Sequence, residues 1–383
     1  MSREAPLKGL KVIELARVLA GQWAGQTLAD LGAEVIKVES PDGDDTRSWG
    51  PPFVTNPDGS RDAAYYHSTN RGKRSVVADF RTEEGLDKVR ALAADADVLI
   101  ENFKLGGLKR FGLDYDSLAA VNPRLVYCSI TGFGQDGPYA ARPGYDYIVQ
   151  GMSGIMDLTG EPDGDPQKIG VAFADIITGL YSTIAIQAAL AQRQRTGRGQ
   201  HIDMALFDCM VGVLANQGMN YLVSGQSPVR MGNAHPNVTP YAVFQTRDGP
   251  FILAVGNDRQ FRSFCQVIGK PELGSDPRFS SNEARIENRD ALLALVRAAM
   301  AAWRRADLLA ALEEAGVPYG PINSVAEALT DPQIAHRQMV ADFERPDGTG
   351  TIRGVRSPFR FSDADLALGR ASPQLGEDDE AIG

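Results

Sequence analysis

The chain opens with alternating apolar and helical blocks. Residues 10–15 (LKVIEL) form a short apolar run, residues 22–31 show helical spacing, and residues 35–38 form a second apolar run that ends at Glu39. A strand, a helix and a second strand in this order are typical of a parallel sheet covered by helices. We therefore expect the chain to begin with a β-α-β unit.

The same alternation continues further along the chain. Apolar runs at 75–78, 98–100 and 125–130 are separated by helical stretches at 83–94 and 116–121. This repetition predicts a doubly wound α/β domain, in which ligands bind at the carboxyl ends of the strands. The expected fold class is therefore α/β, with a large Rossmann-like domain built on a parallel sheet.

A long apolar helix follows, and after it the pattern of apolar and polar residues changes. Residues 175–193 predict a largely buried helix that ends at the glycines of TGRGQ, and residues 207–222 predict another apolar helix. The texture changes near Gly225. Beyond it, residues 241–246 and 251–255 have the pattern of a hairpin joined by RDGP.

These features divide the chain into three parts. Residues 1–224 form the first part of the large domain, and residues 225–320 form a smaller α+β domain. We expect residues 321–383 to return to the large domain, with candidate strands at 352–355 and 359–361.

Composition and charge exclude several classes of protein. Apolar residues make up 43% of the 383 residues and charged residues 23%, as in soluble globular proteins. The net charge of −10, with no basic stripe, predicts no nucleic-acid partner. No apolar run predicts a membrane span, and the first residues (MSREAPLKGL) do not form a signal peptide. We therefore expect a cytoplasmic protein without a membrane partner.

The spacing of cysteines and histidines predicts no metal site. The cysteines show no CxxC pairing, and we expect them to be reduced core residues: Cys128, Cys209 and Cys265. The histidines are equally scattered: His67, His201, His235 and His336. No spacing typical of metal ligands appears among them.

The turn at residues 16–25 (ARVLAGQWAG) leaves three interpretations open. Glu39 closes the second strand, where an acid binds ribose in dinucleotide sites, but the turn lacks the GxGxxG pattern. Gly21 and Gly25 allow backbone amides to approach a phosphate or a carbonyl group. The same glycines also fit an ordinary turn.

Basic residues recur near the predicted strand ends, at Arg47, Lys73, Arg74 and Arg110. Each alone fits a solvated surface charge. Together they are compatible with an anionic ligand that carries several phosphates, because such ligands bind in the crevice at the strand ends.

Asp175, in GVAFADIITGLYS, is the strongest catalytic candidate. It stands at the predicted start of a helix, where free amides and the helix dipole keep a carboxylate ionised, and the same position fits a structural N-cap. Asp146, in PGYDYIVQG, fits a turn as well as a catalytic role. His235 lies in a Gly-Asn-Pro loop that suits either a site or a structural role.

Eight motifs in one order resemble the class III CoA-transferase family: LKGLKVIELARVLAG, LGAEVIKVE, NRGKRSVVADF, ADVLIENF, GYDYIVQG, VAFADIITGLYS, TGRGQHIDMALFD and GVPYGPIN. The resemblance runs from Leu7 to Gly376. The family includes formyl-CoA:oxalate and carnitine CoA-transferases and, with different chemistry, α-methylacyl-CoA racemases. It implies an interlocked-ring homodimer, with each active site between the large domain of one chain and the small domain of the other.

The resemblance also implies residue roles. Asp175 matches the catalytic aspartate of the family, and Tyr145 and Asp146 match the pair near it. Positions that contact CoA in the family match the following residues: Val18, Leu19, Ala20, Lys73, Asn102, Phe103, Arg110, Phe111 and Leu206. CoA and its acyl thioester are then substrates, and no tightly bound cofactor is expected.

The implied reaction is the transfer of CoA from succinyl-CoA to a dicarboxylic acid. The motifs RMGNAHPNVTPY, which contains His235, VGNDRQF and GVPYGPIN resemble the succinyl-CoA:dicarboxylate members, whereas Leu19 stands where formyl-CoA transferases carry glutamine. Arg47 or Arg259 supplies a cation for the distal carboxylate. The alternative, a racemase, needs a histidine where this chain has Tyr145, and a phenol is a poor base at neutral pH.

Overall fold

The computed structural model describes residues 3–382, which cluster into two compact units. The first unit contains the residues up to Ile155, Lys168–Gln226 and the residues from Pro332 onward. The second unit contains Met156–Gln167 and Ser227–Asp331.

The second unit thus includes two stretches outside the expected small domain of residues 225–320. The segment Met156–Gln167 joins it because the amide of Gly232 donates to the carbonyl of Gly160 at 3.1 Å and Arg230 pairs with Asp157 at 3.0 Å. Contacts between residues some 70 positions apart leave no periodic signal in the sequence, so the division by texture could not find them.

A six-stranded parallel sheet forms the centre of the first unit, in the order β5-β2-β1-β6-β7-β8. The strands are β1 (Lys11–Glu14), β2 (Glu34–Glu39), β5 (Arg74–Val77), β6 (Val98–Glu101), β7 (Val126–Thr131) and β8 (His201–Ala205). Val12 in β1 pairs with Val35 in β2 and Val98 in β6. The predicted α/β fold with a parallel sheet is confirmed.

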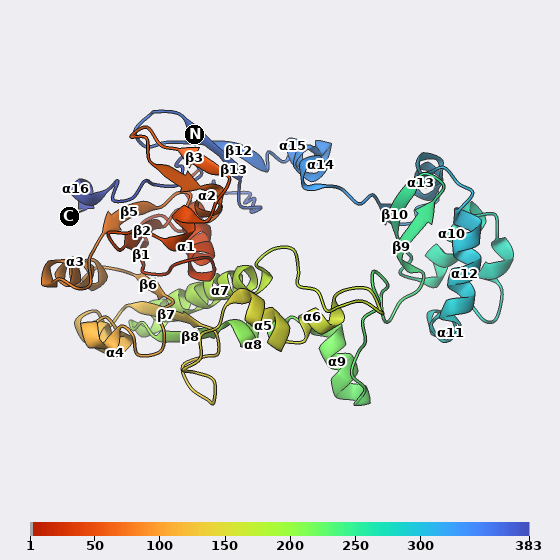
Figure 1. Ribbon diagram of the computed structural model, residues 1–383, viewed down its shortest axis with the longest axis horizontal. Helices are drawn as coiled ribbons and strands as arrows, with labels where there is room; N and C mark the ends of the chain where they lie inside the picture. The colour runs from red at the N-terminus through yellow and green to blue at the C-terminus, as the bar shows by residue number, and fades with distance from the viewer. Residues whose placement is uncertain (1–2, 383) are drawn as a thin grey trace. The chain divides into compact units, whose positions relative to one another are not determined.

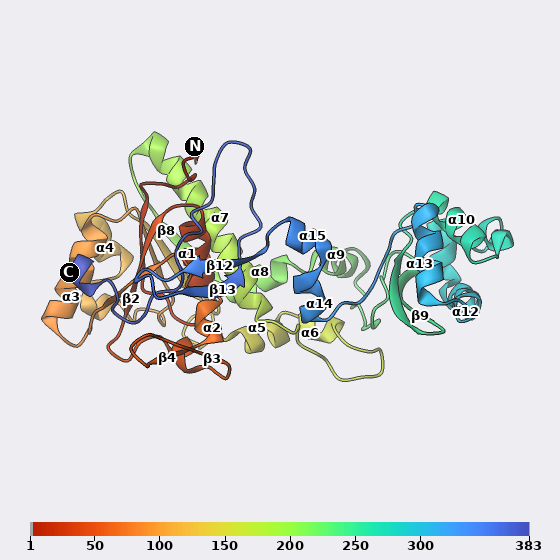
Figure 2. The same ribbon diagram turned by 90° about the horizontal axis from the view of Figure 1, so that it is seen from above.

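Helices cover both faces of this sheet (Figures 1 and 2). Side chains alternate between two cores, so Val12 faces one and Ile13 the other. The first core includes α1 (Ala20–Asp30), α7 (Phe173–Thr196) and α8 (Leu206–Gly212), and the second includes α3 (Glu83–Ala94) and α4 (Tyr115–Val121).

Short elements complete the first unit. The helices are α2 (Ala64–His67), α5 (Asp146–Met152), α9 (Ala215–Ser224), α15 (Pro332–His336) and α16 (Asp379–Ile382), with the 3₁₀ turns η1 (Asp45–Ser48) and η2 (Lys109–Phe111). Helix α6 (Ile155–Leu158) begins at the boundary between the units. The hairpins are β3 (Phe53–Thr55) with β4 (Arg61–Ala63) and β12 (Val340–Glu344) with β13 (Thr351–Val355).

Two of three sequence predictions for these elements need correction, and the strand predicted at 352–355 is confirmed. The helix predicted at 207–222 is divided: α8 ends at Gly212, and Ala215, the first residue of α9, has a positive φ of 46° that interrupts a continuous helix. The strand predicted at 352–355 lies within β13, but its partner β12 was not predicted. The strand predicted at 359–361 does not form, and Pro358 beside it lacks the amide that a strand requires.

Helix α7 is, by length and composition alone, apolar enough to cross a membrane, which the sequence analysis did not note. It is the one such helix among residues 3–382. Its buried side chains pack in the first core, where Gly179 lets the carbonyl of Ala20 and the Trp23 side chain approach closely. These contacts make α7 a core helix of the first unit.

The second unit is built on the antiparallel sheet β11-β10-β9, with β9 (Tyr241–Thr246), β10 (Gly249–Ala254) and β11 (Tyr319–Gly320). Its helices are α10 (Asp258–Val267), α11 (Asn282–Glu287), α12 (Arg289–Met300), α13 (Arg305–Glu314) and α14 (Val325–Thr330), with the 3₁₀ turn η3 (Pro271–Gly274). A separate apolar core that contains Phe251 and Phe264 holds this unit together.

Candidate active site

A cavity of about 470 Å³ lies in the first unit beside the amino-terminal end of α7. Five short segments that contain predicted site residues meet there. The lining includes Val18, Leu19, Ala20, Asn102, Phe103, Tyr145, Asp146, Asp175 and Leu206. The fold thus brings together most of the predicted site residues of the first unit, at the carboxyl ends of β1, β6 and β8 and at the starts of α5 and α7.

Asp175 lies in the first turn of α7 but does not cap it. The carboxylate of Asp146 does so, because its Oδ1 accepts from the amides of Ala174 at 2.8 Å and Asp175 at 3.3 Å. Its Oδ2 accepts from Gln150 Nε2 at 2.8 Å. Within residues 3–382 no hydrogen bond or ion pair involves the Asp175 carboxylate, so it stays available to a ligand.

The environment of Asp175 makes its carboxylate reactive. Burial, together with the nearby negative charge of Asp146, raises the pKa of Asp175 to about 7. A carboxylate that has lost part of its hydration and has no hydrogen-bond donor is a better nucleophile than one in water. It is ionised above neutral pH, where it can attack a carbonyl carbon.

Two tyrosines stand near this carboxylate. Tyr145 is the N-cap residue of α5 and lines the cavity with a largely exposed ring. Tyr65, which the sequence analysis missed, lies in α2, and burial and then the charges of Asp175 and Asp146 raise its pKa to about 12. Its link to Asp175 spans 110 residues of sequence, so no local signal could have revealed it.

The loop from β1 to α1 forms another wall of the cavity. Val18 has a φ of 70°, which a β-branched residue rarely adopts. Leu19 is the N-cap of α1, and no side chain caps the helix, so the first-turn amides have no intrahelical partner. Amides of this kind stabilise negative charge that develops on a carbonyl oxygen.

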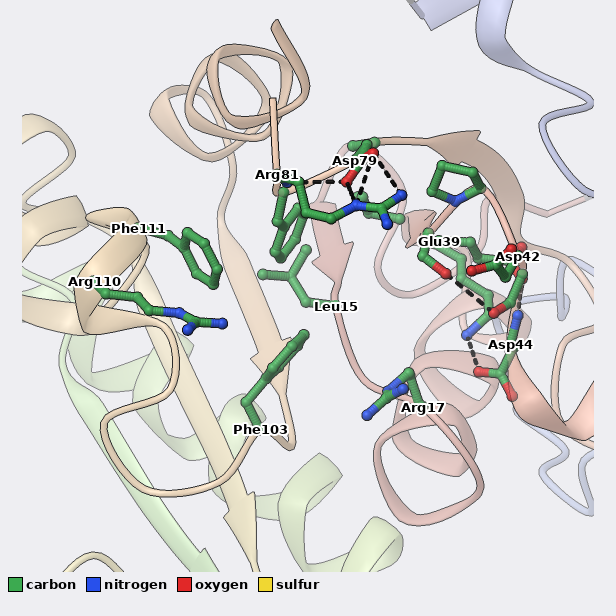
Figure 3. Close-up of a pocket in the computed structure, with 17 residues that line it drawn as sticks. Leu15, Arg17, Glu39, Asp42, Asp44, Asp79, Arg81, Phe103, Arg110 and Phe111 are labelled. Carbon is green, nitrogen blue, oxygen red and sulfur yellow. Dashed lines mark hydrogen bonds and ion pairs between the residues drawn. The ribbon is translucent and has the colours of Figure 1, made fainter. Parts of the chain in front are cut away.

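A second cavity, of about 290 Å³, lies beside the first, and Arg17 and Phe103 line both. Three aromatic rings form part of its lining: the Phe80 ring centroid lies 6.1 Å from that of Phe103 and 5.8 Å from that of Phe111. Carboxylates also line it, at Glu39, Asp42, Asp44 and Asp79. Figure 3 shows Phe103, Phe111 and Leu15 facing the same space, with the guanidinium of Arg110 between the two rings. Such a pocket suits a planar base attached to phosphates.

The structure assigns other contacts to two predicted ligand residues. Lys73 is fully buried, and its Nζ donates to Glu14 Oε1 at 2.8 Å and to Asn70 Oδ1 at 2.9 Å. Arg47 is also buried, and its guanidinium forms ion pairs with Glu39 at 2.7 Å and Asp62 at 3.0 Å. These bonds occupy both cations, so neither reaches a substrate in this structure.

Asn102 lines the cavity, but its side chain is hydrogen-bonded to the backbone of Arg17. Its Oδ1 accepts from the amide of Arg17 at 2.9 Å, and its Nδ2 donates to the carbonyl of Arg17 at 2.7 Å. The remaining candidates, His235 and Arg259, belong to the second unit. There the ring of His235 lies 5.2 Å from that of Tyr241, and Arg289 donates to the carbonyl of His235.

The described residues contain no cluster of three or more side chains that could hold a metal ion. The three cysteines are buried and free. The cavities therefore present carboxylates, aromatic rings, cations and backbone amides.

Comparison with known proteins identifies the relatives of this chain. The model of CoA-transferase family III matches residues 7–379. A succinate–glutarate CoA-transferase of Agrobacterium fabrum is 58% identical over 378 residues, which cover 98% of this chain and 94% of that protein. A succinyl-CoA:glutarate CoA-transferase of Mus musculus is 41% identical over 97% of this chain and 84% of that protein.

Solved structures are similar over the whole chain as well. A CaiB/BaiF family protein from Brucella suis shares 64% sequence identity and has a TM-score of 0.88, with 99% of each chain covered.

Proposed function

Because the chain belongs to CoA-transferase family III and is a CoA-transferase, we propose that it transfers CoA from succinyl-CoA to glutarate or a similar short dicarboxylate, with Asp175 as the covalent relay. The two glutarate enzymes to which it is similar support this choice of substrates. The observation that carries the proposed relay is the state of Asp175: a largely desolvated carboxylate, without a hydrogen-bond donor, in a cavity that adjoins an aromatic and cationic pocket.

The donor half-reaction takes place in two steps. A carboxylate oxygen of Asp175 attacks the thioester carbonyl of succinyl-CoA, which forms a mixed anhydride and releases the CoA thiolate. The thiolate then attacks the Asp175 carbonyl carbon, so that an aspartyl-CoA thioester forms and succinate leaves. The acceptor acid reverses these steps. Its carboxylate attacks the aspartyl-CoA carbonyl, which forms a second anhydride and releases the CoA thiolate, and the thiolate then attacks the acceptor carbonyl, so that acyl-CoA forms and the Asp175 carboxylate leaves. One thioester replaces another of similar energy, so no ATP is needed.

The two adjoining cavities suit the two ends of CoA. The adenine ring stacks among Phe80, Phe103 and Phe111, and Arg110 binds phosphate oxygens. The pantetheine arm passes Phe103 and brings the sulfur to Asp175, beside Leu206. The predicted CoA contacts of Phe103, Arg110, Phe111 and Leu206 remain part of this proposal.

The loop Val18–Ala20 supplies the amides that stabilise the developing oxyanion. They belong to the uncapped start of α1, which lines the same cavity as Asp175. Removal of one oxyanion donor typically costs about 3 kcal/mol of transition-state stabilisation.

The distal carboxylate of the acid needs a cation other than Arg47. Arg142 lines the cavity of Asp175 and makes no ion pair within residues 3–382. We assign this role to Arg142, with Arg259 of the second unit as the alternative from the sequence.

We also propose that the enzyme is a homodimer of interlocked rings, as the family resemblance implies. Large apolar side chains are exposed on α7, at Leu180, Tyr181 and Ile184. Helix α9 exposes others, including Leu222 and Val223, and has no buried residue. A second copy of the chain accounts for these surfaces.

The test of the relay is the substitution Asp175→Asn. It removes the nucleophile and keeps the shape of the side chain, so kcat for transfer between succinyl-CoA and glutarate should fall by roughly 10⁴-fold or more. CoA binding, measured by calorimetry, should change little. Mass spectrometry of the wild-type protein incubated with succinyl-CoA should detect CoA on the peptide that contains Asp175.

Asp208→Asn is the matched control, because Asp208 lies in the first turn of α8 but does not line the cavity. Its kcat should equal that of the wild type. Transfer retained by Asp175→Asn would falsify the covalent relay, and a panel of other acids used faster than glutarate would overturn the proposed acceptor.

A further inference from the structure

The segment that joins β1 to α1 is fixed at several successive residues. The amide of Leu15 donates to the carbonyl of Ile100 at 2.8 Å and so extends the pairing of β1 with β6. The next residues leave the sheet and form the cavity wall at Val18–Ala20. The position of this wall relative to Asp175 depends on what holds Ala16 and Arg17.

Asn102 holds Arg17. It follows directly after β6, and its side-chain amide makes two hydrogen bonds to one residue, accepting from the Arg17 amide and donating to the Arg17 carbonyl. A neighbouring strand would bind the backbone of Arg17 in the same way. Asn102 thus continues the sheet by one residue with a side chain instead of a strand.

Lys37 holds Ala16 from the other side. Its Nζ donates to the Ala16 carbonyl at 3.1 Å and pairs with Asp44 at 3.0 Å and Glu14 at 3.5 Å. Lys37 is fully buried, so solvent does not compete for these bonds. Two successive residues, Ala16 and Arg17, are therefore held in place just before the loop forms the cavity wall.

These fixed points hold the loop in a conformation that it does not favour. The positive φ of 70° at Val18 is costly for a β-branched residue, so the loop needs contacts that keep it in place. The loop also lies tightly against α1, because a Cβ added at Gly21 would approach the Ala16 Cβ to 2.3 Å. The fixed position of Arg17 therefore bears on Val18 and on the first amides of α1.

We propose that Asn102 is a positioning residue for CoA transfer, which acts through the Arg17 backbone and not through contact with CoA. This inference rests on the proposed function. By fixing Arg17, Asn102 holds the Val18–Ala20 amides where the oxyanion of the thioester develops beside Asp175. The resemblance to the family implies instead that this position contacts CoA.

The two roles differ in how kcat and KM respond to substitution. In Asn102→Ala the loop amides lose their alignment, so kcat should fall about 10- to 100-fold, as for a misplaced reacting group. The KM for succinyl-CoA and the calorimetric Kd for CoA should stay within about threefold of the wild-type values. Asn102→Asp should be at least as slow, because its second oxygen faces the Arg17 carbonyl and repels it. Should Asn102→Ala not fold, Asn102→Ser provides the same comparison.

Asn122→Ala is the matched control for loss of an asparagine that binds the backbone. Asn122 donates to the carbonyl of Ala96 at 2.8 Å and accepts from the amide of Arg124 at 3.1 Å, away from the cavity lining. Its Tm should fall while its kcat remains that of the wild type.

Three outcomes would overturn the inference. A rise in KM and Kd with unchanged kcat would make Asn102 a CoA contact, and unchanged kinetics would show that the loop does not need it. The wild-type protein in the same assay separates this inference from the proposed function: absence of transfer there would overturn both, whereas an active wild type with normal Asn102 variants would overturn only the positioning role.

Discussion

Asp146 and Asp175 divide between them the two roles, helix cap and nucleophile, that the sequence left open for Asp175. An N-cap needs a carboxylate that accepts from helix amides, whereas a nucleophile needs one without donors. Asp146, 28 residues from Ala174 in the sequence, reaches the start of α7 and caps it. Asp175 is therefore free of the capping role, and the charge of its neighbour adds to the rise in its pKa.

The pKa of Asp175 predicts an acid limb in the pH dependence of transfer. The nucleophile must be ionised, and burial and Asp146 raise its pKa to about 7. Below that pH, kcat/KM for succinyl-CoA should fall about tenfold per pH unit. Asp146→Asn removes a negative charge and keeps an oxygen for the helix amides. It should lower the pKa of Asp175, and a pH–rate profile should show the limb displaced to lower pH.

Asp45→Asn is the control for this displacement. Asp45 also lines the cavity, but its charge is not among the causes that raise the pKa of Asp175. The acid limb of the pH–rate profile of Asp45→Asn should lie at the same pH as that of the wild type. A limb that stays in place in Asp146→Asn, or moves to higher pH, would contradict the electrostatic role of Asp146.

The sequence indicated which residues after β6 lie near a pocket, but it did not reveal that the predicted phosphate-binding lysine is buried in an ion pair. Phe103, Arg110 and Phe111 follow β6 and were expected near a ligand, and they line one pocket. Lys73 was expected to bind phosphate, yet its partner Glu14 lies 59 residues earlier and pairs with it inside the fold. The sheet order, in which β2 alone separates β1 from β5, brings that pair together, so nothing in NRGKRS signals it.

At the scale of elements, the packing of α1 against the sheet explains Gly25. The sequence suggested that Gly25 lets a ligand approach the backbone. In the structure the neighbour is the Glu14 carboxylate, because a Cβ at Gly25 would lie 1.7 Å from Glu14 Oε2. Lys73 and Lys37 hold that carboxylate at its other oxygen, at 2.8 and 3.5 Å. Gly25 therefore makes room for a buried ion cluster.

Gly25→Ala should destabilise the protein. The added methyl group forces the Glu14 carboxylate away from Lys73, and overpacking of this kind costs about 1–3 kcal/mol in the free energy of unfolding. Urea denaturation measures the change. Gly212→Ala is the control, because Gly212 also lies in a helix, α8, but nothing stands within 4 Å of its added Cβ. Equal stability of the two variants would show that the carboxylate can move at no cost.

Periodicity located the elements of the first unit well because each is local. The strands β1, β2 and β6 and the helix α3 lie where the apolar pattern predicted them. The break between α8 and α9 escaped prediction because it depends on the backbone of one alanine, Ala215, and not on a proline. A helix pattern that continues across such a break gives no warning of it.

At the scale of the molecule, the parts of each unit that come from distant segments were the least predictable. The carboxyl-terminal residues return to the first unit, where Asp378 accepts from the amide of Ser75 at 3.0 Å and Asp379 from that of Val77 at 2.9 Å. They thereby bind free amides of β5, an edge strand of the sheet. The return of residues 321–383 to the large domain was expected from the sequence, but these particular contacts were not, because they join residues about 300 positions apart.

The exposed apolar surface of α9 leads to the last prediction. Leu222 and Val223 are 74% and 81% exposed, in a helix that buries no residue in its own chain. If a second copy covers them, the wild-type protein should have twice the chain mass of 41.2 kDa by light scattering. A variant with both Leu222→Glu and Val223→Glu keeps its own core but places charges in the interface, so it should have the mass of one chain and lose transfer activity.

Val121→Glu introduces the same charge at a 69% exposed position of α4 and should remain dimeric and active. An active wild-type protein with the mass of one chain would exclude the homodimer, and an active, dimeric double variant would remove α9 from the interface.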